Sequence, residues 1–140
     1  MNEKLIRVGT TYIPVSNVEH AAVWYEVKLG AVVNYKDDGK AILDLANQSL
    51  FLVKAEKGQS ANFRDHKGEV RFSMTFEVDG LDALHSLRTD LIEKGVAAGE
   101  IENRGHSGRN FVFTDPDGNK FDVWSELSPI FKERFLQRGR

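Results

Sequence analysis

The sequence predicts an α+β fold in which two tandem βαβββ modules form a half-open cup. Two observations carry this prediction. The order strand, helix, strand, strand, strand is found twice along the chain, and residues 10–17 superpose on residues 73–80 with a constant offset of 63 residues. Helices packed on one side of the sheets would leave the other side open as the cup.

The first module begins with a strand expected at residues 7–16. Asn17 has a side chain suited to a helix N-cap, and Gly30 can adopt the left-handed conformation that ends a helix, which predicts a helix over 18–29. Three strands are expected to follow, at residues 31–34, 41–45 and 49–54. The charged turn 36–39 separates the first two of these strands.

A polar stretch at residues 56–68 shows no periodicity and predicts a flexible loop between the modules. Apolar and polar residues then alternate over 71–78, which indicates a strand. Asp79 is expected to cap a helix over 81–94, and Gly95 to end it. Three more strands and a terminal helix are expected at 97–103, 109–113, 120–124 and 128–136, with a tight DPDGN turn at 115–119.

The length of 140 residues is typical of a single domain. Its expected parts are module one at about 6–54, a linker loop at 55–69, module two at about 70–126 and a C-terminal helix at about 128–136. Each module would be marginally stable alone. We therefore expect the modules to share a core or to exchange partners in a homodimer.

Composition excludes several classes of function. Lys plus Arg is 19 and Asp plus Glu is 21, so the net charge is −2, and no excess of positive charge indicates binding to nucleic acid or to an anionic membrane. The absence of cysteine excludes disulfides, thiolate metal sites and a cysteine nucleophile, and it fits a cytoplasmic protein. No signal-peptide core, membrane-spanning run, phosphate-binding glycine loop, GxSxG elbow or zinc spacing is found.

Strand alternation indicates which side chains enter the cup. The apolar residues Phe72, Met74, Phe76 and Val78 should pack beneath a helix, as should Phe121 and Val123 of the last strand. The side chains expected to line the cup are Thr10, Tyr12, Arg71, Ser73, Thr75, Glu77, Phe111, Phe113, Lys120, Asp122 and Trp124. Aromatic walls with a few polar groups are typical of a small-molecule site.

Three stretches carry a family resemblance: RVGTTYIPVSNVEHAAVWYEVKLG at 7–30, FSMTFEVDGLDAL at 72–84 and FVFTDPDGNKFDVW at 111–124. They resemble the vicinal oxygen chelate superfamily, which contains glyoxalase I, extradiol dioxygenases, and fosfomycin- and bleomycin-resistance proteins. The resemblance implies the cup of paired βαβββ modules. It leaves the function open, because this superfamily supports unrelated chemistries on one scaffold.

In metal-dependent members of the superfamily, side chains on four strands bind one divalent ion. The resemblance places these positions at Thr10, Ser73, Asp122 and the neighbourhood of Phe51. Only Asp122 is a competent ligand, whereas a catalytic divalent site needs about three donors. No histidine lies on a strand facing the cup, and only His66 or His106 could fold over it from a loop. The expectation is therefore no cofactor, with a divalent metal as the open alternative.

Two classes of function stay open. The first is a metal-independent enzyme of lyase or isomerase type in which Asp122 transfers a proton. The second is a non-catalytic protein of the bleomycin-resistance type that sequesters a drug or metabolite. In both, Tyr12 and Trp124 either stack a planar ligand or simply close the cup. Arg71 either binds an anionic group of the ligand or pairs with Glu77 or Asp122. The expected partner is a small, partly aromatic or anionic molecule.

Overall fold

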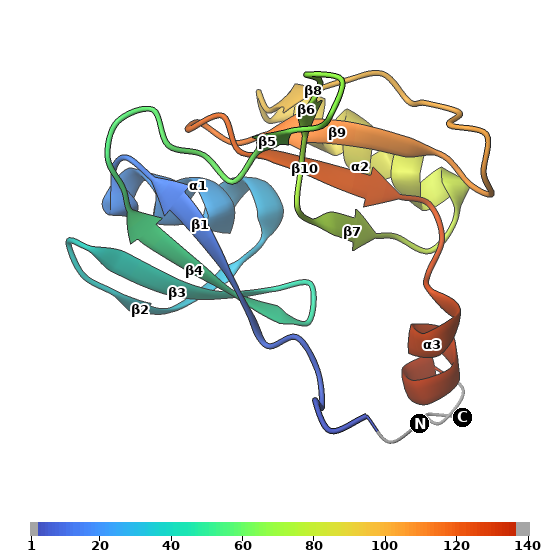
Figure 1. The fold of residues 1–140 in the computed structure, drawn as a ribbon, viewed down its shortest axis with the longest axis horizontal. Helices are drawn as coiled ribbons and strands as arrows, with labels where there is room; N and C mark the ends of the chain where they lie inside the picture. The colour runs from blue at the N-terminus through green and yellow to red at the C-terminus, as the bar shows by residue number, and fades with distance from the viewer. Residues whose placement is uncertain (1–2, 137–140) are drawn as a thin grey trace. The chain divides into compact units, whose positions relative to one another are not determined.

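The computed structural model describes residues 3–136. Contacts within the chain divide it into two compact units, which we call unit 1 (1–61 with 116–119) and unit 2 (62–115 with 120–140). Each unit contains a four-stranded sheet and one long helix (Figure 1). The predicted α+β class and the repeated βαβββ order are confirmed.

Unit 1 has the predicted order of elements: β1 (Thr10–Val15), α1 (Val18–Leu29), β2 (Val32–Lys36), β3 (Lys40–Leu45) and β4 (Gln48–Lys54). The strands lie in the order β1-β4-β3-β2, with β1 parallel to β4. Both helix signals are confirmed, because the Asn17 side chain accepts a hydrogen bond from the His20 N–H and Gly30 has a φ of 77°. Tyr25 of α1 is fully buried in the core, together with Ile13, Leu43, Leu50 and Leu52 of the strands.

The DPDGN turn at 115–119 contributes its residues 116–119 to unit 1. Asp117 accepts a hydrogen bond from the Ser16 N–H at 2.9 Å. The buried Asn119 side chain accepts from the Ala61 N–H at 2.7 Å and donates to the Pro14 carbonyl at 2.9 Å. The turn therefore supplies hydrogen bonds that hold the end of β1 in addition to reversing the chain.

Unit 2 repeats the order with β7 (Thr75–Glu77), α2 (Leu81–Glu93), β8 (Ala97–Ala98), β9 (Asn110–Thr114) and β10 (Lys120–Trp124). The sheet order is β7-β10-β9-β8. The predicted Asp79 cap is wrong, because Gly80 is the N-cap and makes no side-chain cap bond. The strand expected at 97–103 shortens to β8 and an isolated bridge from Glu102 to Asn110. The terminal helix consists of α3 (Pro129–Phe131) and a π-helical segment, η1 (Lys132–Leu136).

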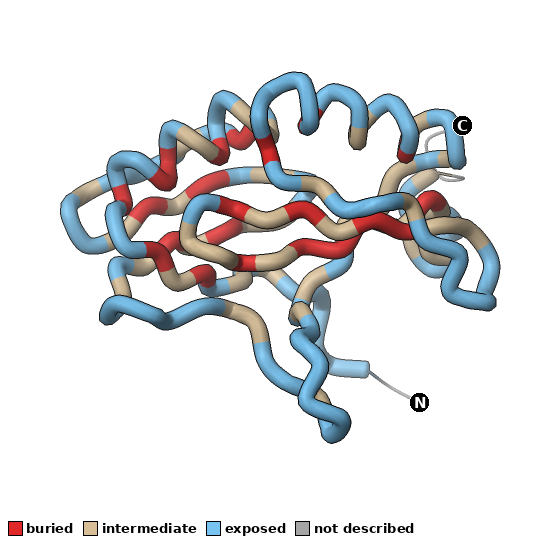
Figure 2. The backbone as a smooth tube through the Cα atoms, turned by 90° about the horizontal axis from the view of Figure 1, so that it is seen from above, coloured by how far each residue is buried: buried red, intermediate tan, exposed pale blue. Residues whose placement is uncertain are grey.

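The linker expected to be a flexible loop contains a hairpin of β5 (Phe63–Arg64) and β6 (Val70–Arg71). Asp65 organises it, since one carboxylate oxygen accepts the N–H groups of Lys67 and Glu69 and the other accepts from Arg71 Nε at 2.8 Å. Most of the hairpin is exposed (pale blue in Figure 2). The strand predicted over 71–78 is interrupted at 72–74, between β6 and β7.

The core of unit 2 is aromatic, and α2 covers it (Figure 1). Phe113 lies 5.4 Å from Phe121 and 6.1 Å from Phe76, measured between ring centroids. The other fully buried side chains here include Leu84, Leu91, Phe111 and Val123. Within residues 3–136, no helix is long and apolar enough to cross a membrane.

Candidate functional site

The face of the unit 2 sheet opposite this aromatic core carries a group of polar side chains and a tryptophan. Strand pairing sets Asp122 opposite Thr75 and Val112, and Trp124 opposite Glu77 and Asn110. Directly paired residues share a face of a sheet, and Phe121 and Val123 alternate to the other face. We call this surface the Asp122 face; it consists of Thr75, Glu77, Asn110, Val112, Asp122 and Trp124.

Asp122 is the centre of this face and is only 3% exposed. Its Oδ2 accepts hydrogen bonds from Thr75 Oγ1 at 3.0 Å and Asn110 Nδ2 at 2.9 Å. Its Oδ1 lies 3.1 Å from Arg104 Nη2 in an ion pair whose geometry is not that of a hydrogen bond. These three partners explain how a carboxylate is accommodated in a buried position, where an unpaired charge would be strongly unfavourable.

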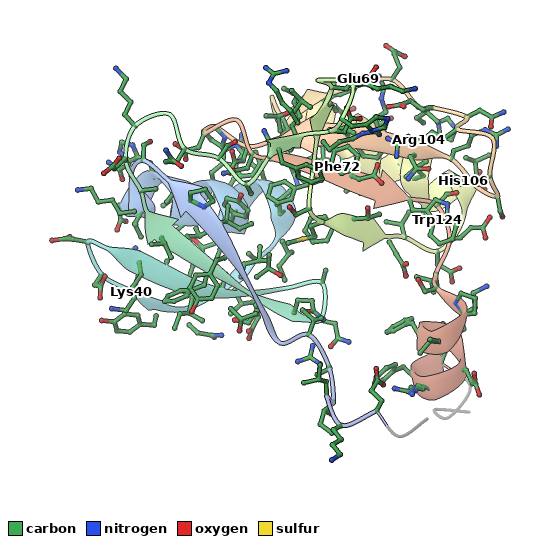
Figure 3. The ribbon with its side chains drawn as sticks, viewed as in Figure 1. Lys40, Glu69, Phe72, Arg104, His106 and Trp124 are labelled. Atoms are coloured by element: carbon green, nitrogen blue, oxygen red, sulfur yellow. The ribbon has the colours of Figure 1, made fainter. Side chains whose placement is uncertain are left out.

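Arg104 reaches Asp122 from the long connection between β8 and β9 (Figure 3). Its Nε and Nη2 donate to the two carboxylate oxygens of Glu102 at 3.1 and 3.4 Å, and its guanidinium carbon lies 5.7 Å from the centre of the Phe72 ring. Burial lowers the pKa of Arg104, but the interactions of its guanidinium with the carboxylates of Glu102 and Asp122 together outweigh burial and raise that pKa. Arg104 is therefore a fixed cation between two carboxylates.

Trp124 is held by the same β8–β9 connection. Its Nε1 donates to the Ser107 carbonyl at 2.9 Å, and the His106 ring lies edge-on to it at 6.1 Å (Figure 3). Gly108, with a φ of +77°, brings the backbone so close that an added Cβ would lie 2.7 Å from Trp124 Nε1. Only glycine fits here without rearrangement, so the loop conformation and the Trp124 position depend on each other.

Asn110 carries an unusual unsatisfied group. Its Nδ2 donates to Asp122, which fixes the orientation of the amide. Its Oδ1 is then buried without a hydrogen-bond partner within residues 3–136. A buried acceptor without a donor costs about 1–3 kcal/mol, so this atom marks a place where a donor from outside the chain would stabilise the site.

The predicted site residues on the first module lie in unit 1. Tyr12 on β1 pairs with Phe51 on β4, and their rings meet edge-on at 4.7 Å. Thr10 pairs with Ser49 on the same two strands. Tyr12 is 64% exposed, and both Thr10 and Tyr12 lie on the side of β1 opposite the buried Ile13.

Four predicted positions are corrected by the structure. Phe111 and Phe113 do not face the cup, because they pair with the core residues Val123 and Phe121 and are buried with them. Phe72, expected in the core, instead lies beside Arg104. Arg71 pairs with neither Glu77 nor Asp122, because the Asp65 turn holds its guanidinium within the β5–β6 hairpin.

The remaining predicted residues have mixed positions. Thr75 and Asp122 are joined by a hydrogen bond, whereas Ser73 is exposed in the interruption between β6 and β7. Glu77 accepts hydrogen bonds from the N–H, at 2.9 Å, and the hydroxyl of Ser128, which ties it to the start of α3. Lys120 directs its ammonium toward Thr114 Oγ1, at 3.5 Å.

Sequence reasoning missed Arg104 and Asn110 as members of this site. The only local signal was the composition of the segment 103–109 (NRGHSGR), in which two glycines separate polar residues capable of reaching a strand face. His106, considered as a residue that could fold over the cup, does contact Trp124.

The side chains present do not fit a divalent metal ion. Of the four positions expected to hold one, Thr10, Phe51 and Ser73 offer no strong donor. Asp122 offers a carboxylate, but hydrogen bonds and the Arg104 guanidinium already engage it. In the described part of the chain, no group of three or more His, Asp or Glu side chains is arranged to hold a metal.

Comparisons with known proteins agree on the fold. A model of the Glyoxalase/Bleomycin resistance protein/Dioxygenase superfamily matches residues 7–123. No curated protein sequence matches the chain.

Solved structures with the same fold include lactoylglutathione lyase from Agrobacterium tumefaciens, with a TM-score of 0.69, 15% identity and coverage of 87% of this chain and 95% of that chain. TnmS3, an antibiotic binding protein from Streptomyces sp. CB03234, matches with a TM-score of 0.68 and 24% identity, over 91% of this chain and 100% of that chain. The fosfomycin resistance protein FosX from Listeria monocytogenes, complexed with Mn(II) and sulfate, matches with a TM-score of 0.68 and 16% identity, over the whole of both chains. At these identities the likeness shows the fold alone.

Proposed function

Because the chain belongs to the Glyoxalase/Bleomycin resistance protein/Dioxygenase superfamily, we propose that it is a metal-independent protein that binds a small planar organic molecule on the Asp122 face and releases it unchanged. Membership leaves both enzymes and binding proteins open, since the superfamily fold supports many chemistries. The choice between an enzyme and a binding protein depends on whether Asp122, the one candidate catalytic group, is free to act on a substrate.

The engagement of Asp122 is the observation that carries this proposal. A general base must face the proton that it removes, within hydrogen-bond reach. Both oxygens of Asp122 instead face Thr75, Asn110 or Arg104, and the side chain is buried. Asp122 thus acts on the position of Arg104 rather than on a substrate, which favours binding over catalysis.

The groups beside Asp122 suit a planar ligand. Trp124 and Phe72 present aromatic rings, and the exposed segment with His106 lies next to Trp124. Aromatic surface with a few fixed polar groups is typical of small-molecule sites. The likeness in fold to an antibiotic binding protein supports this choice, although the likeness to a lyase has similar strength.

We also propose that the protein is a homodimer. Leu5, Ile6 and Val8 precede β1 with most of their surface exposed, and Ile130 and Phe135 are exposed near the other end of the described chain. Apolar side chains in such numbers on two segments are typical of surfaces that associate with another copy.

Fluorescence of Trp124 tests the binding proposal. In a Trp24→Phe variant Trp124 is the sole tryptophan, and the matched Trp124→Phe variant retains only Trp24. Titration with quinoline should give saturable quenching in the first variant and none in the second, and binding of indole, which fluoresces in the same band as tryptophan, is measured by calorimetry. Each compound should then be recovered unchanged by mass spectrometry. Equal responses of the two variants, or chemical conversion of a bound compound, would contradict the proposal.

A further inference from the structure

We infer that the ligand of the Asp122 face is a planar organic cation bearing N–H groups, and that Arg104 occupies the place of this cation when no ligand is bound. The inference rests on the proposed function and adds the chemical class of the ligand. Three independent observations support it: the charges around Arg104, two oxygens that lack donors, and the contact of Arg104 with an aromatic ring.

The charges around Arg104 do not balance. Its single positive charge lies against the carboxylates of both Glu102 and Asp122. Lys120 and Glu77 of the same sheet contribute one charge of each sign and leave this balance unchanged, because their partners Thr114 and Ser128 are neutral. The cluster of Glu102, Arg104 and Asp122 thus carries one more negative than positive charge, which attracts a cation and repels an anion.

Two oxygens at the centre of the face lack a hydrogen-bond donor in the described chain. They are Oδ1 of Asn110 and Oδ1 of Asp122, the latter having only the ion pair with Arg104. Both can only accept hydrogen bonds, because the amide orientation of Asn110 is fixed by its bond to Asp122. A ligand that satisfies them must bring N–H or O–H donors, and charged N–H donors bind a carboxylate most strongly.

Arg104 itself shows that a planar cation fits this place. Its guanidinium lies against the Phe72 ring and beside the Asp122 carboxylate. An amidinium has the same planar shape and the same forked N–H groups, and it gains from the same contact between a cation and an aromatic ring. Asp122 Oδ1 lies against Arg104, so such a ligand reaches this oxygen by displacing the Arg104 side chain. Arg104, carried by an exposed loop, is thus an internal competitor of the ligand.

Three probes of one shape test the charge preference: benzamidine, benzamide and benzoate, with charges of +1, 0 and −1. Affinities are measured by Trp124 fluorescence in the Trp24→Phe background. Benzamidine should bind about tenfold more tightly than benzamide, and benzoate most weakly. Arg104→Met should tighten benzamidine binding by about tenfold, because the competitor is removed and Asp122 is left without a cation.

Two further variants keep the test decisive. Arg88→Met is the matched control, because Arg88 also pairs with a glutamate and its side chain is 24% exposed, against 26% for Arg104. The Arg88→Met substitution should leave the affinities for all three probes unchanged. Glu102→Gln removes one charge from an exposed position and should weaken benzamidine binding selectively, even if Arg104→Met does not fold.

The outcomes separate this inference from the proposed function. Tight benzoate binding that Arg104→Met abolishes would show that Arg104 is an anion receptor and would overturn the inference. Equal affinities for the three probes would also overturn it while leaving the binding function intact. No binding of any planar compound, indole and quinoline included, to either protein would overturn both.

Discussion

Arg104 Nη2 lies 3.1 Å from Oδ1 of the buried Asp122, so a loop arginine pairs with the one carboxylate that the resemblance in sequence places at a metal-ligand position. The same guanidinium contacts Glu102 and the Phe72 ring. In this arrangement the Asp122 carboxylate positions the Arg104 guanidinium, instead of binding a metal or removing a proton.

Asp122→Asn should lower the free energy of unfolding by about 2 kcal/mol, because Arg104 would lose its buried partner and the hydrogen bonds of Thr75 and Asn110 would weaken. Urea unfolding followed by circular dichroism measures the change. Asp44→Asn, at an exposed position on β3, is the matched control and should change stability by less than about 0.5 kcal/mol. Equal effects of the two substitutions would contradict the assigned role of Asp122.

Gly108→Ala should destabilise the protein by about 2 kcal/mol and shift the emission of Trp124 to longer wavelength. The added Cβ meets Trp124 Nε1 and Ser125 Oγ at 2.7 Å, in a backbone with a φ of +77°. Gly105→Ala separates the two causes, because Gly105 has a φ of +89° but nothing within 4 Å of its Cβ position. It should cost about 1 kcal/mol and leave the emission of Trp124 unchanged. The same spectral shift in both variants would contradict the close contact.

Local signals were sufficient to predict most of the fold. Asn17 begins a helix and Gly30 ends it, each through hydrogen bonds to residues only a few positions away, so their roles are evident in the sequence. The hairpin at 63–71 was missed because it depends on Asp65 accepting hydrogen bonds from residues up to six positions away. That same contact holds Arg71, and no periodicity reveals it.

The site was less predictable because its members meet through strand register. Phe111 and Phe113 were expected in the cup, whereas their pairing with Val123 and Phe121 requires them to share the core face. Alternation along β7 and β10 places Thr75, Asp122 and Trp124 on one face of the sheet, as the strand pairing does; their part in a binding site stays a prediction. Arg104 could not be placed, since a long-range ion pair from an irregular loop sets its position.

Stability at acid pH should depend on Asp37. Hydrogen bonds from the Tyr35 hydroxyl, the Lys40 ammonium and the Gly39 N–H hold the pKa of this carboxyl well below its usual range. A folded-state pKa below the unfolded one stabilises the protein at pH values above the unfolded pKa of about 4, and this contribution is lost as the pH falls below it.

Asp37→Asn should therefore flatten the fall in unfolding free energy between about pH 4 and pH 2, as measured by urea unfolding at a series of pH values. Asp38→Asn, in the same turn, removes a carboxyl with no hydrogen-bond partner in the described chain and should leave the slope as in the unmodified protein. A slope that Asp37→Asn does not change would refute the coupling of this turn to stability.

The dialysed protein should sediment as a homodimer at micromolar concentration, with twice the chain mass of 15.8 kDa. The exposed side chains of Leu5, Ile6 and Val8 are the motivation, and burial of such surface on association is favourable. Ile6→Lys should shift the equilibrium toward monomer, while Lys4→Ala, on the same segment, should not. A monomeric mass for the unmodified protein would contradict the dimer.

Finally, the purified and dialysed protein should retain no stoichiometric divalent metal. Hydrated metal ions exchange their water for protein ligands when several strong donors converge, and here a single carboxylate is available at the family positions. Asp122 would also have to release Arg104 before binding an ion, which leaves a guanidinium beside the incoming positive charge. Elemental analysis after incubation with zinc, manganese or nickel and dialysis gives the metal content directly. Arg104→Met, which frees Asp122, is the informative comparison: it should still retain no metal, because Thr10, Phe51 and Ser73 supply no further strong donors. One equivalent of metal in the unmodified protein, lost in Asp122→Asn, would demonstrate a ligand set different from the one described above.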